Sequence, residues 1–490
     1  MKHHIQKLLI VFITFLLSQA APANDSLVLS LTQTIELAQQ QSPTVQSARH
    51  AFLAAYWNYR QYRANYLPSL TLISSPNLNR SINKITQADG TSVFLKQNQL
   101  STDLTLKVNQ KISLTGGSLF VKSTLTRLDE LEIQHTSFSS QPLLIGYEQS
   151  LFGFNSLRWE RRIEPVRYRK ARQTYAETLE LVSAKACDHF FRLMAAQTNL
   201  DMARLNLASA DTLYNMAKGR YSIGNINENE MLQLEINRLN EETNFMDAEI
   251  YMEEEMQSFR SFLGLEQDIV PRLTAPDSVP MFTVPVTEAL DMAVEHSPDP
   301  TYYQLIKLES KSNLAYAKAN TGLKADIYMH FGLSQTGQTM RDSYRNPLNQ
   351  EYVSLSLSLP ILDWGRGRGQ VRVARSNLAL TETQAEQGMR DFRQNVQKIV
   401  MQFNMQGRKV NIAAKTDRQA EHRYEVARRL YVLGRSTILD LNSAISEKDN
   451  ARRNYINAQS TYWTLYYTIR SMTGYDFLNG REIAADIKQP

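Results

Sequence analysis

Residues 351–380 read EYVSLSLSLPILDWGRGRGQVRVARSNLAL and join two different patterns of side chains. Successive side chains of a β-strand face opposite sides of the sheet, and apolar residues here alternate with serines. The apolar positions are Val353, Leu355, Leu357, Leu359 and Ile361, and the serines are Ser354, Ser356 and Ser358. This alternation predicts a strand with one aliphatic face, suited to apolar surroundings, and one hydroxyl face, suited to water. After Pro360 and a glycine-rich turn, the spacing becomes helical and stays so for roughly a hundred residues.

The chain has 490 residues, of which 42% are hydrophobic and 21% charged, enough for two or three ordinary domains. Residues 1–23 have the basic start, apolar middle and small-residue end of a secretory signal peptide, which predicts export. No later stretch is long and apolar enough for a membrane-spanning helix, which needs about 20 residues. Any membrane span is therefore expected to consist of β-strands.

Charge and cysteine content exclude several other classes of protein. The formal net charge of +5 is too small, and the basic residues too scattered, to indicate binding of nucleic acid. Cys187 is the only cysteine, so neither an intramolecular disulfide nor a cysteine metal cluster can form.

The sequence contains two tandem copies of one repeat unit. Early pairs such as Pro43 and Pro298 lie 255 positions apart, whereas later pairs lie 210 positions apart. The later pairs include Tyr221 and Tyr431, Gly224 and Gly434, Arg260 and Arg470, and Gly264 and Gly474. The first copy therefore carries roughly 45 additional residues between these two sets of pairs.

Each copy is predicted to contain a helix, then strands, then a long helical hairpin. In the first copy, residues 24–264, these are a helix at 31–66, strands within 69–152 and a hairpin at 156–263. In the second copy, residues 286–474, they are a helix at 286–320, strands at 325–362 and a hairpin at 366–473. Residues 265–285 contain four prolines and are expected to connect the copies in an equatorial region, and the tail at 475–490 takes the equivalent place after the second copy.

The additional residues of the first copy include two alternating segments on either side of Thr115-Gly116-Gly117, a combination typical of a tight turn. We predict that residues 102–127 form an extra hairpin, which gives four strands in the first copy and two in the second. The alternative is that residues 102–127 fold as a soluble plug.

Two copies of helix, strands and long helical hairpin, with a Ser-Pro pair and a Tyr-x-x-Gly turn in each, resemble the TolC-type outer-membrane efflux and secretion channels (outer membrane factors). The resemblance covers essentially the whole mature chain. It implies a mainly α fold with a membrane β portion, in which three subunits close one outer-membrane β-barrel continuous with a periplasmic α-helical barrel.

The resemblance also implies partners and a location. The expected assembly is a homotrimer in contact with outer-membrane lipid, which docks onto a periplasmic adaptor (membrane fusion) protein and an inner-membrane efflux or secretion pump. The expected location is the bacterial outer membrane, extending into the periplasm.

Candidate gate residues follow from the resemblance at the tips of the hairpins. Asp440 matches the carboxylate that constricts the pore in this family, and Tyr431 matches the tip tyrosine. Glu230 and Tyr221 take the related places in the first copy, and Gly224 and Gly434 are the glycines of the tip turns. Carboxylates from three subunits in one ring would favour cations and repel one another.

Two positions depart from the family pattern. Ser443 stands at a second acidic position, and Ser436 stands at a basic latch position, with Arg435 one residue away. These departures predict a wider or differently latched gate. Without the resemblance, Asp440 and Glu230 are more typical of a solvated polar face just past a turn.

Aromatic residues mark the expected boundary between membrane and periplasm. Trp364 lies in the elbow Asp363-Trp364-Gly365 that follows the strand quoted above, and Phe154 and Trp159 lie at the corresponding place in the first copy.

No enzymatic chemistry emerges from the sequence. Gly365, Gly367 and Gly369 resemble a dinucleotide-binding loop, but Gln370 occupies the place of its last glycine, so a flexible elbow is the better interpretation. No nucleophile–base set and no pair of histidines with metal-ligand spacing is present, which predicts neither catalysis nor a cofactor. The predicted function is a passive exit duct whose cargo the sequence does not specify. The alternative is a secreted coiled-coil scaffold or adhesin without channel activity.

Overall fold

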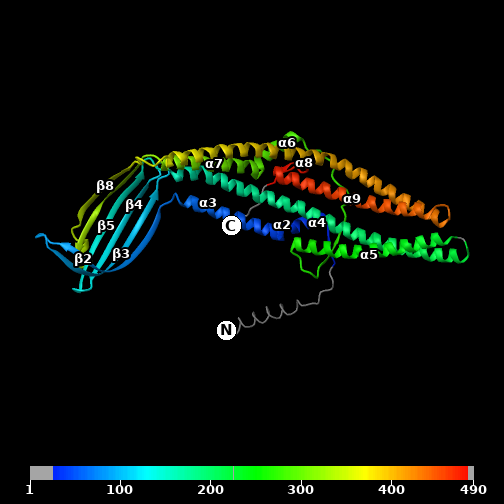
Figure 1. The fold of residues 1–490 in the computed structure, drawn as a ribbon, viewed down its shortest axis with the longest axis horizontal. Helices are drawn as coiled ribbons and strands as arrows, with labels where there is room; N and C mark the ends of the chain where they lie inside the picture. The colour runs from blue at the N-terminus through cyan, green and yellow to red at the C-terminus, as the bar shows by residue number, and fades with distance from the viewer. Residues whose placement is uncertain (1–25, 225, 277, 484–490) are drawn as a thin grey trace, which may run out of the picture. The chain divides into compact units, whose positions relative to one another are not determined.

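The computed structural model describes residues 26–224, 226–276 and 278–483 (Figure 1). The predicted signal peptide, residues 1–23, lies outside the described residues, as do residues 484–490 of the tail. The described chain divides into two compact units, and each takes residues from both copies of the repeat. We call them the helical unit (1–51, 172–297 and 392–490) and the sheet unit (52–171 and 298–391).

The helical unit contains the greater part of two long helical hairpins, one from each copy, whose first residues (156–171 and 366–391) belong to the sheet unit. Helices α4 (Ser156–Ser222) and α5 (Glu228–Leu263) form the first hairpin, and α8 (Arg366–Val432) and α9 (Ile438–Thr473) form the second. The unit also contains β1 (Ser26–Leu29) paired in parallel with β6 (Val270–Leu273), helices α2 (Leu31–Gln41) and α6 (Val286–His296), and the short strands β9 (Tyr475–Asp476) and β10 (Arg481–Glu482).

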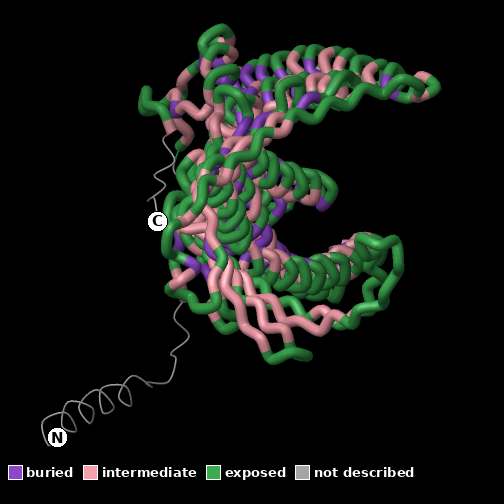
Figure 2. Tube along the Cα trace, turned by 90° about the vertical axis from the view of Figure 1, so that its left-hand side faces the viewer, coloured by how far each residue is buried: buried purple, intermediate pink, exposed green. Residues whose placement is uncertain are grey.

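Its core lies between α2, α4 and α5, where large apolar side chains are removed from water. Phe190 and Leu193 of α4 and Phe259 and Leu263 of α5 are each fully buried in one cluster. Burial of side chains of this size contributes about 1.5–3 kcal/mol each. The buried positions in Figure 2 follow the helices, whereas the strands are mostly half-buried or exposed.

The first helix of each copy is interrupted where the sequence pattern predicts one continuous helix. In the first copy α2 ends at Gln41 and α3 runs from Pro43 to Ala64; in the second copy α6 ends at His296 and α7 runs from Pro298 to Asn320. Ser42 and Ser297 have non-helical ψ angles of 135° and 147° because the proline that follows each disfavours helical geometry. The apolar spacing continues across both breaks, which is why spacing alone does not reveal them.

The sheet unit contains one antiparallel sheet of six strands in the order β2-β3-β4-β5-β7-β8. The strands are β2 (Ser69–Thr86), β3 (Ser92–Lys111), β4 (Ser118–Glu130), β5 (His135–Ser150), β7 (Lys324–Gly337) and β8 (Leu348–Ser358). Four strands come from the first copy and two from the second, as the sequence pattern predicts. Residues 102–127 belong to β3 and β4, which pair from Gln99–Glu130 to Lys111–Ser118, so this hairpin is part of the sheet and not a separate plug.

The two faces of the sheet differ in chemistry. One, the serine face, carries Ser354 and Ser356 of β8; the other, the leucine face, carries Leu355 and Leu357. Cross-strand pairs continue the leucine face to the other edge, where Leu72 of β2 pairs with Leu106 of β3. Leu355 is 58% exposed and Leu72 is 67% exposed in the single chain.

The alternation in the sequence continues to Ile361, but β8 ends at Ser358. Pro360 lacks the N–H group that a ladder requires, which stops the strand two residues earlier. A short 3-10 turn, η1 (Asp342–Tyr344), lies in the connection between β7 and β8. Within the described residues, no helix is both long and apolar enough to cross a membrane.

Candidate functional site

The tips of the two helical hairpins carry the predicted gate residues on two turns of the same design. Gly224 and Gly434 have φ angles of 73° and 71°. The amide N–H of each donates to the backbone carbonyl oxygen of the tyrosine three residues earlier at 2.9 Å. A Cβ at either glycine would meet no atom within 4 Å. The left-handed backbone conformation, and not lack of space, therefore requires glycine here.

Asp440 lies in the first turn of α9 and takes part in a reciprocal capping box. Its amide donates to Thr437 Oγ1 at 3.2 Å, while its carboxylate accepts the Thr437 hydroxyl at 2.7 Å and the Ser436 hydroxyl at 3.2 Å. Hydrogen bonds from Thr437 and then from Ser436 hold the pKa of this exposed carboxyl below its usual value. Ser436, at the predicted latch position, thus contacts Asp440 of its own chain. The Thr-x-x-Asp pattern is a capping signal that the sequence itself contains.

Glu230 occupies the equivalent place on α5. Its amide donates to Asn227 Oδ1 at 2.8 Å, which is the first of the two bonds of the capping box. The carboxylate of Glu230 acts on the other hairpin, because its charge adds to the effect of burial in raising the pKa of Tyr431.

The two tip tyrosines have different surroundings despite their equivalent positions. Tyr431 is only 7% exposed and packs in a cluster with Leu213, Leu234 and Leu441, which belong to both hairpins. Tyr221 is 42% exposed. A side chain buried between helices holds the hairpins together at the tip, whereas an exposed one is free to meet another chain.

Basic side chains at the tips are also placed by the structure. Arg220 donates from Nη2 to the carbonyl oxygen of Val432 at 3.3 Å, which is a second link between the hairpins. Arg435 is exposed, and its backbone amide donates to Leu430 at 2.9 Å. Ser443, at the second acidic position, is exposed beside Glu447, with 3.5 Å between its hydroxyl and that carboxylate.

The elbow between β8 and α8 is a defined turn. Trp364 has a φ angle of 55°, which is uncommon for a residue with a side chain, and is 90% exposed. The Asp363 carboxylate accepts the amides of Gly365 at 2.9 Å and Gly367 at 2.7 Å and so caps α8. Gly365 therefore belongs to the strand-to-helix turn, and Gly367 and Gly369 lie in the first turn of α8.

The other two predicted boundary aromatics pack against helices. Phe154 meets Tyr316 edge to face, with ring centroids 5.3 Å apart. Trp159 is half-buried beside Ile163 and Leu305, and the Arg162 guanidinium lies 5.4 Å from its ring centroid. Of the three, Trp364 is the one placed fully at the surface.

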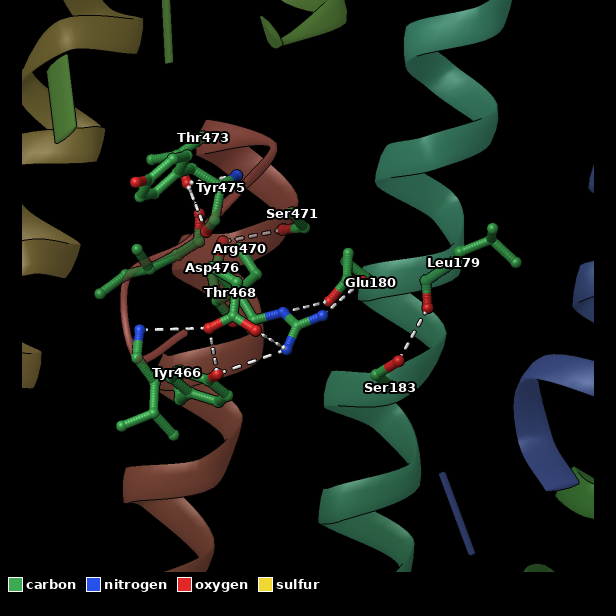
Figure 3. Close-up of polar contacts among 12 residues, drawn as sticks. Leu179, Glu180, Ser183, Tyr466, Thr468, Arg470, Ser471, Thr473, Tyr475 and Asp476 are labelled. Carbon is green, nitrogen blue, oxygen red and sulfur yellow. Dashed lines mark hydrogen bonds and ion pairs between the residues drawn. The ribbon is translucent and has the colours of Figure 1, made fainter. Parts of the chain in front are cut away.

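A buried ionic cluster in the helical unit was not predicted from the sequence. Arg470 of α9 lies between Glu180 of α4 and Asp476 of β9, at 2.8 Å and 3.0 Å (Figure 3). The Tyr466 hydroxyl donates to Asp476 at 2.7 Å, and the Asn479 side-chain amide donates to it at 2.7 Å. Burial opposes ionisation of Asp476, but these two hydrogen bonds and Arg470 together lower its pKa. Burial raises the pKa of Glu180 by more than Arg470 lowers it.

The equivalent arginine of the first copy holds the connector in a simpler way. Arg260 donates from Nε to the carbonyl oxygen of Ile269 at 2.7 Å. In both copies, the arginine near the end of the hairpin therefore binds the chain that follows. The repeated Arg260/Arg470 pair was the sequence signal for this role.

No cluster of three or more histidine, cysteine, aspartate or glutamate side chains suited to a metal ion occurs among the residues that the structure describes. At the tips, Asp440 and the amide of Glu230 take part in helix capping, and Arg220 makes a contact between the hairpins.

Comparison with known proteins identifies the family. The model of the outer membrane efflux protein family matches residues 34–265 and 313–475. A search of curated protein sequences gives no match.

Solved structures with the same fold span nearly the whole chain. The CmeC outer membrane channel of Campylobacter jejuni is 14% identical, with a TM-score of 0.67 and coverage of 93% of this chain and 87% of CmeC. The outer membrane protein VceC of Vibrio cholerae is 15% identical, with a TM-score of 0.65 and coverage of 91% and 96%. The open-state MtrE outer membrane channel of Neisseria gonorrhoeae is 14% identical, with a TM-score of 0.59 and coverage of 92% and 90%.

These matches confirm the predicted fold class, two tandem copies that each contain helix, strands and long helical hairpin. They also confirm the resemblance on which the candidate gate residues were chosen. Because the family model covers most of the sequence, the chain belongs to the outer membrane efflux protein family.

Proposed function

We propose that three copies of this chain form a passive exit channel for efflux or secretion, which crosses the outer membrane and extends into the periplasm. The observation that carries this proposal is the sheet with two different faces and two open edges. Within the described chain, β2 and β8 each pair with a single neighbour, β3 and β7 respectively. A sheet in a membrane must have no open edge, because nothing in hydrocarbon satisfies unpaired backbone groups. Pairing of β8 of one copy with β2 of the next removes the edges.

The faces of the sheet support the same arrangement. In a closed assembly of six-stranded sheets, the leucine face contacts lipid and the serine face lines an aqueous lumen. The shortest strand of the six-stranded sheet, β8, has 11 residues, which matches the length of a membrane-crossing strand. Trp364 at the elbow supports a boundary between membrane and periplasm at this level.

The long hairpins are proposed to line the periplasmic part of the duct and to dock at their tips on a periplasmic adaptor. An inner-membrane pump is proposed to supply the energy. The exposed residues Tyr221, Arg435 and Asp440 are the proposed contacts and gate elements, whereas Tyr431 acts by fixing the hairpins to each other.

Extraction and reconstitution test the channel. The mature protein is expected to leave membranes only with detergent, to cross-link as a trimer and to produce stepwise conductance in a planar bilayer. Protein denatured before reconstitution serves as the control. Release of the folded protein into buffer without detergent, or absence of conductance from the purified trimer, would contradict the proposal.

Replacement of Asp440 tests the gate. Asp440→Asn keeps an oxygen for the capping bond of α9 and removes the charge, so we expect the preference for cations over anions to fall about two- to threefold without unfolding. Because hydrogen bonds lower the pKa of Asp440 from its ordinary value, the contribution of its carboxylate to the wild-type preference is expected to persist as pH falls through the usual titration range of aspartate and to be lost only below it.

The control is Glu447→Gln on the same helix, where the carboxylate is paired with Arg423. Ion selectivity is measured from reversal potentials in asymmetric salt. An equal change in both variants would show that Asp440 acts as one surface charge among many, and no change in Asp440→Asn would exclude it from the gate.

A further inference from the structure

The hairpin of β2 and β3 continues beyond the rest of the sheet as a two-stranded ribbon. Pairing of β3 with β4 starts at Gln99, whereas pairing of β2 with β3 continues to Thr86–Ser92. Residues 80–98, which we call the ribbon, therefore pair only with each other, apart from one bond between Asn98 and Leu131. The ribbon ends in an ordered turn, where the Asp89 carboxylate accepts the amide and hydroxyl of Thr91 at 2.9 and 2.6 Å. Figure 1 shows these strands reaching past their neighbours.

One side of the ribbon is both basic and apolar. The register places Arg80, Ile82, Lys84, Phe94 and Lys96 on the side that continues the leucine face. Ile82 is 65% exposed and Phe94 is 70% exposed, and the three basic side chains are exposed. Within residues 80–98 the single acidic residue is Asp89, in the turn. The charge on this side is therefore positive and unopposed along the ribbon.

The other side of the ribbon, which continues the serine face, is uncharged. Its polar residues are Ser81, Asn83 and Gln97, its apolar residues are Ile85, Val93 and Leu95, and the Asn83 side chain donates diagonally to the side-chain oxygen of Gln97. A ribbon that only needed solubility would carry charge on both sides, so the one-sided distribution indicates a specific environment for the basic side.

That environment follows from the continuity of the leucine face. Below the ribbon the face continues through the pairs Leu78–Leu100 and Leu72–Leu106 towards the helices of the sheet unit. On the same face, Asp129 pairs with Leu100 just below the ribbon and is engaged by Arg127 at 3.0 Å and by Thr136. If the leucine face contacts hydrocarbon, Arg80, Lys84 and Lys96 lie where lipid headgroups begin, at the end of the sheet away from its helices. Long basic side chains at that level extend to the headgroup phosphates, while their stems and Phe94 stay among acyl chains.

We infer that the basic side of the ribbon binds the phosphate groups of lipids in the membrane leaflet that faces away from the helices. This inference rests on the membrane placement in the proposed function. The ribbon anchors the sheet at a fixed depth by combining charge attraction with apolar insertion.

Competition between lipids in native mass spectrometry tests the inference. The full-length protein in neutral detergent is incubated with equal amounts of phosphatidylglycerol and phosphatidylcholine, and the bound lipids are counted. Wild type is expected to retain phosphatidylglycerol preferentially. In the triple variant Arg80→Gln/Lys84→Gln/Lys96→Gln, we expect the ratio of bound phosphatidylglycerol to bound phosphatidylcholine to fall about tenfold. The matched control is Lys107→Gln/Lys111→Gln/Lys122→Gln, which removes three lysines from the serine face and should leave the preference unchanged.

A measurement without charge removal keeps the test valid if the triple variant fails to fold. Phe94→Trp is compared in vesicles that contain brominated phosphatidylglycerol or brominated phosphatidylcholine at equal fractions. We expect stronger quenching of the added fluorescence by the anionic lipid, and weaker quenching when salt is raised. Equal quenching, or equal loss of preference in the two triple variants, would overturn the inference. Because neither readout uses conductance, a protein that binds the lipid but forms no channel would contradict the proposed function alone.

Discussion

Arg470→Ala is expected to lower the free energy of unfolding of the helical unit by about 3–5 kcal/mol, since it leaves two buried carboxylates without their counter-charge. The Arg470 side chain is 16% exposed, and Glu180 and Asp476 are 5% and 0% exposed, so water cannot replace the lost contacts. The change is measured by chemical denaturation of the detergent-solubilised protein, followed by circular dichroism.

Arg260→Ala is the matched control in the other copy. Its side chain is equally shielded, but its short contact is to a backbone carbonyl, with Glu253 farther away at 3.8 Å. We expect a loss of about 1–2 kcal/mol from this variant. Equal losses in the two variants would show that packing of the arginine stem, and not its charge, stabilises the cluster.

The effect of pH separates these explanations further. Without Arg470, burial raises the folded pKa of Glu180 further above its unfolded value, whereas the hydrogen bonds from Asn479 and Tyr466 still act on Asp476. The penalty for burying the charge of Glu180 is present above that raised pKa and disappears as pH falls, because protonation removes the charge. The difference in free energy of unfolding between wild type and Arg470→Ala should therefore become smaller as pH falls from about 7 to about 5. In wild type, the pKa of Asp476 is lowered, so its carboxylate contributes fully to the free energy of unfolding over the same pH interval. This contribution is lost only below about pH 3.8.

Leu355→Arg is expected to destabilise the membrane-inserted assembly by about 2–4 kcal/mol for each chain, the cost of an arginine on the lipid-facing side of a barrel near mid-membrane. Leu355 pairs with Ile327 on the leucine face, where it is exposed in the single chain. The loss should appear as less heat-resistant trimer in membranes and a lower midpoint of urea unfolding from vesicles.

The neighbouring position provides the control. Ser356→Arg places the same side chain one residue along the same strand, on the serine face opposite Asp326. We expect assembly to be preserved, with a change in conductance at most, because the side chain enters water. If both variants assemble equally well, the leucine face does not contact lipid and the membrane placement of the sheet is wrong.

Periodicity in the sequence predicted the sheet well, because side-chain direction in a strand follows directly from residue number. Residues 102–127 were expected to add a hairpin, and β3 and β4 pair throughout that segment. The expected elbow at Trp364 is also present, although its left-handed conformation follows from no pattern in the sequence.

Other features depend on tertiary contacts that a single sequence does not encode in a readable way. Glu180 and Arg470 lie 290 positions apart, so nothing local indicates that one neutralises the other. Likewise, Tyr221 and Tyr431 occupy equivalent places in the two turns, yet only Tyr431 is buried, since burial depends on how the hairpins pack. The capping role of Asp440 follows from the Thr437-x-x-Asp440 pattern, whereas its predicted gate role rests on the family resemblance alone.

The unequal edges of the sheet have a consequence for biogenesis. β2 presents 18 residues along one free edge, and β8 presents 11 along the other. A newly exported chain therefore has two unpaired edge strands, and any extended segment that it meets can pair with them. Correct pairing between the sheet edges of different copies competes with such additions. The outcome depends on the concentration of chains, so folding and assembly are coupled. In the proposed trimer, β2 is longer than β8, so part of its edge has no partner strand across the seam between subunits.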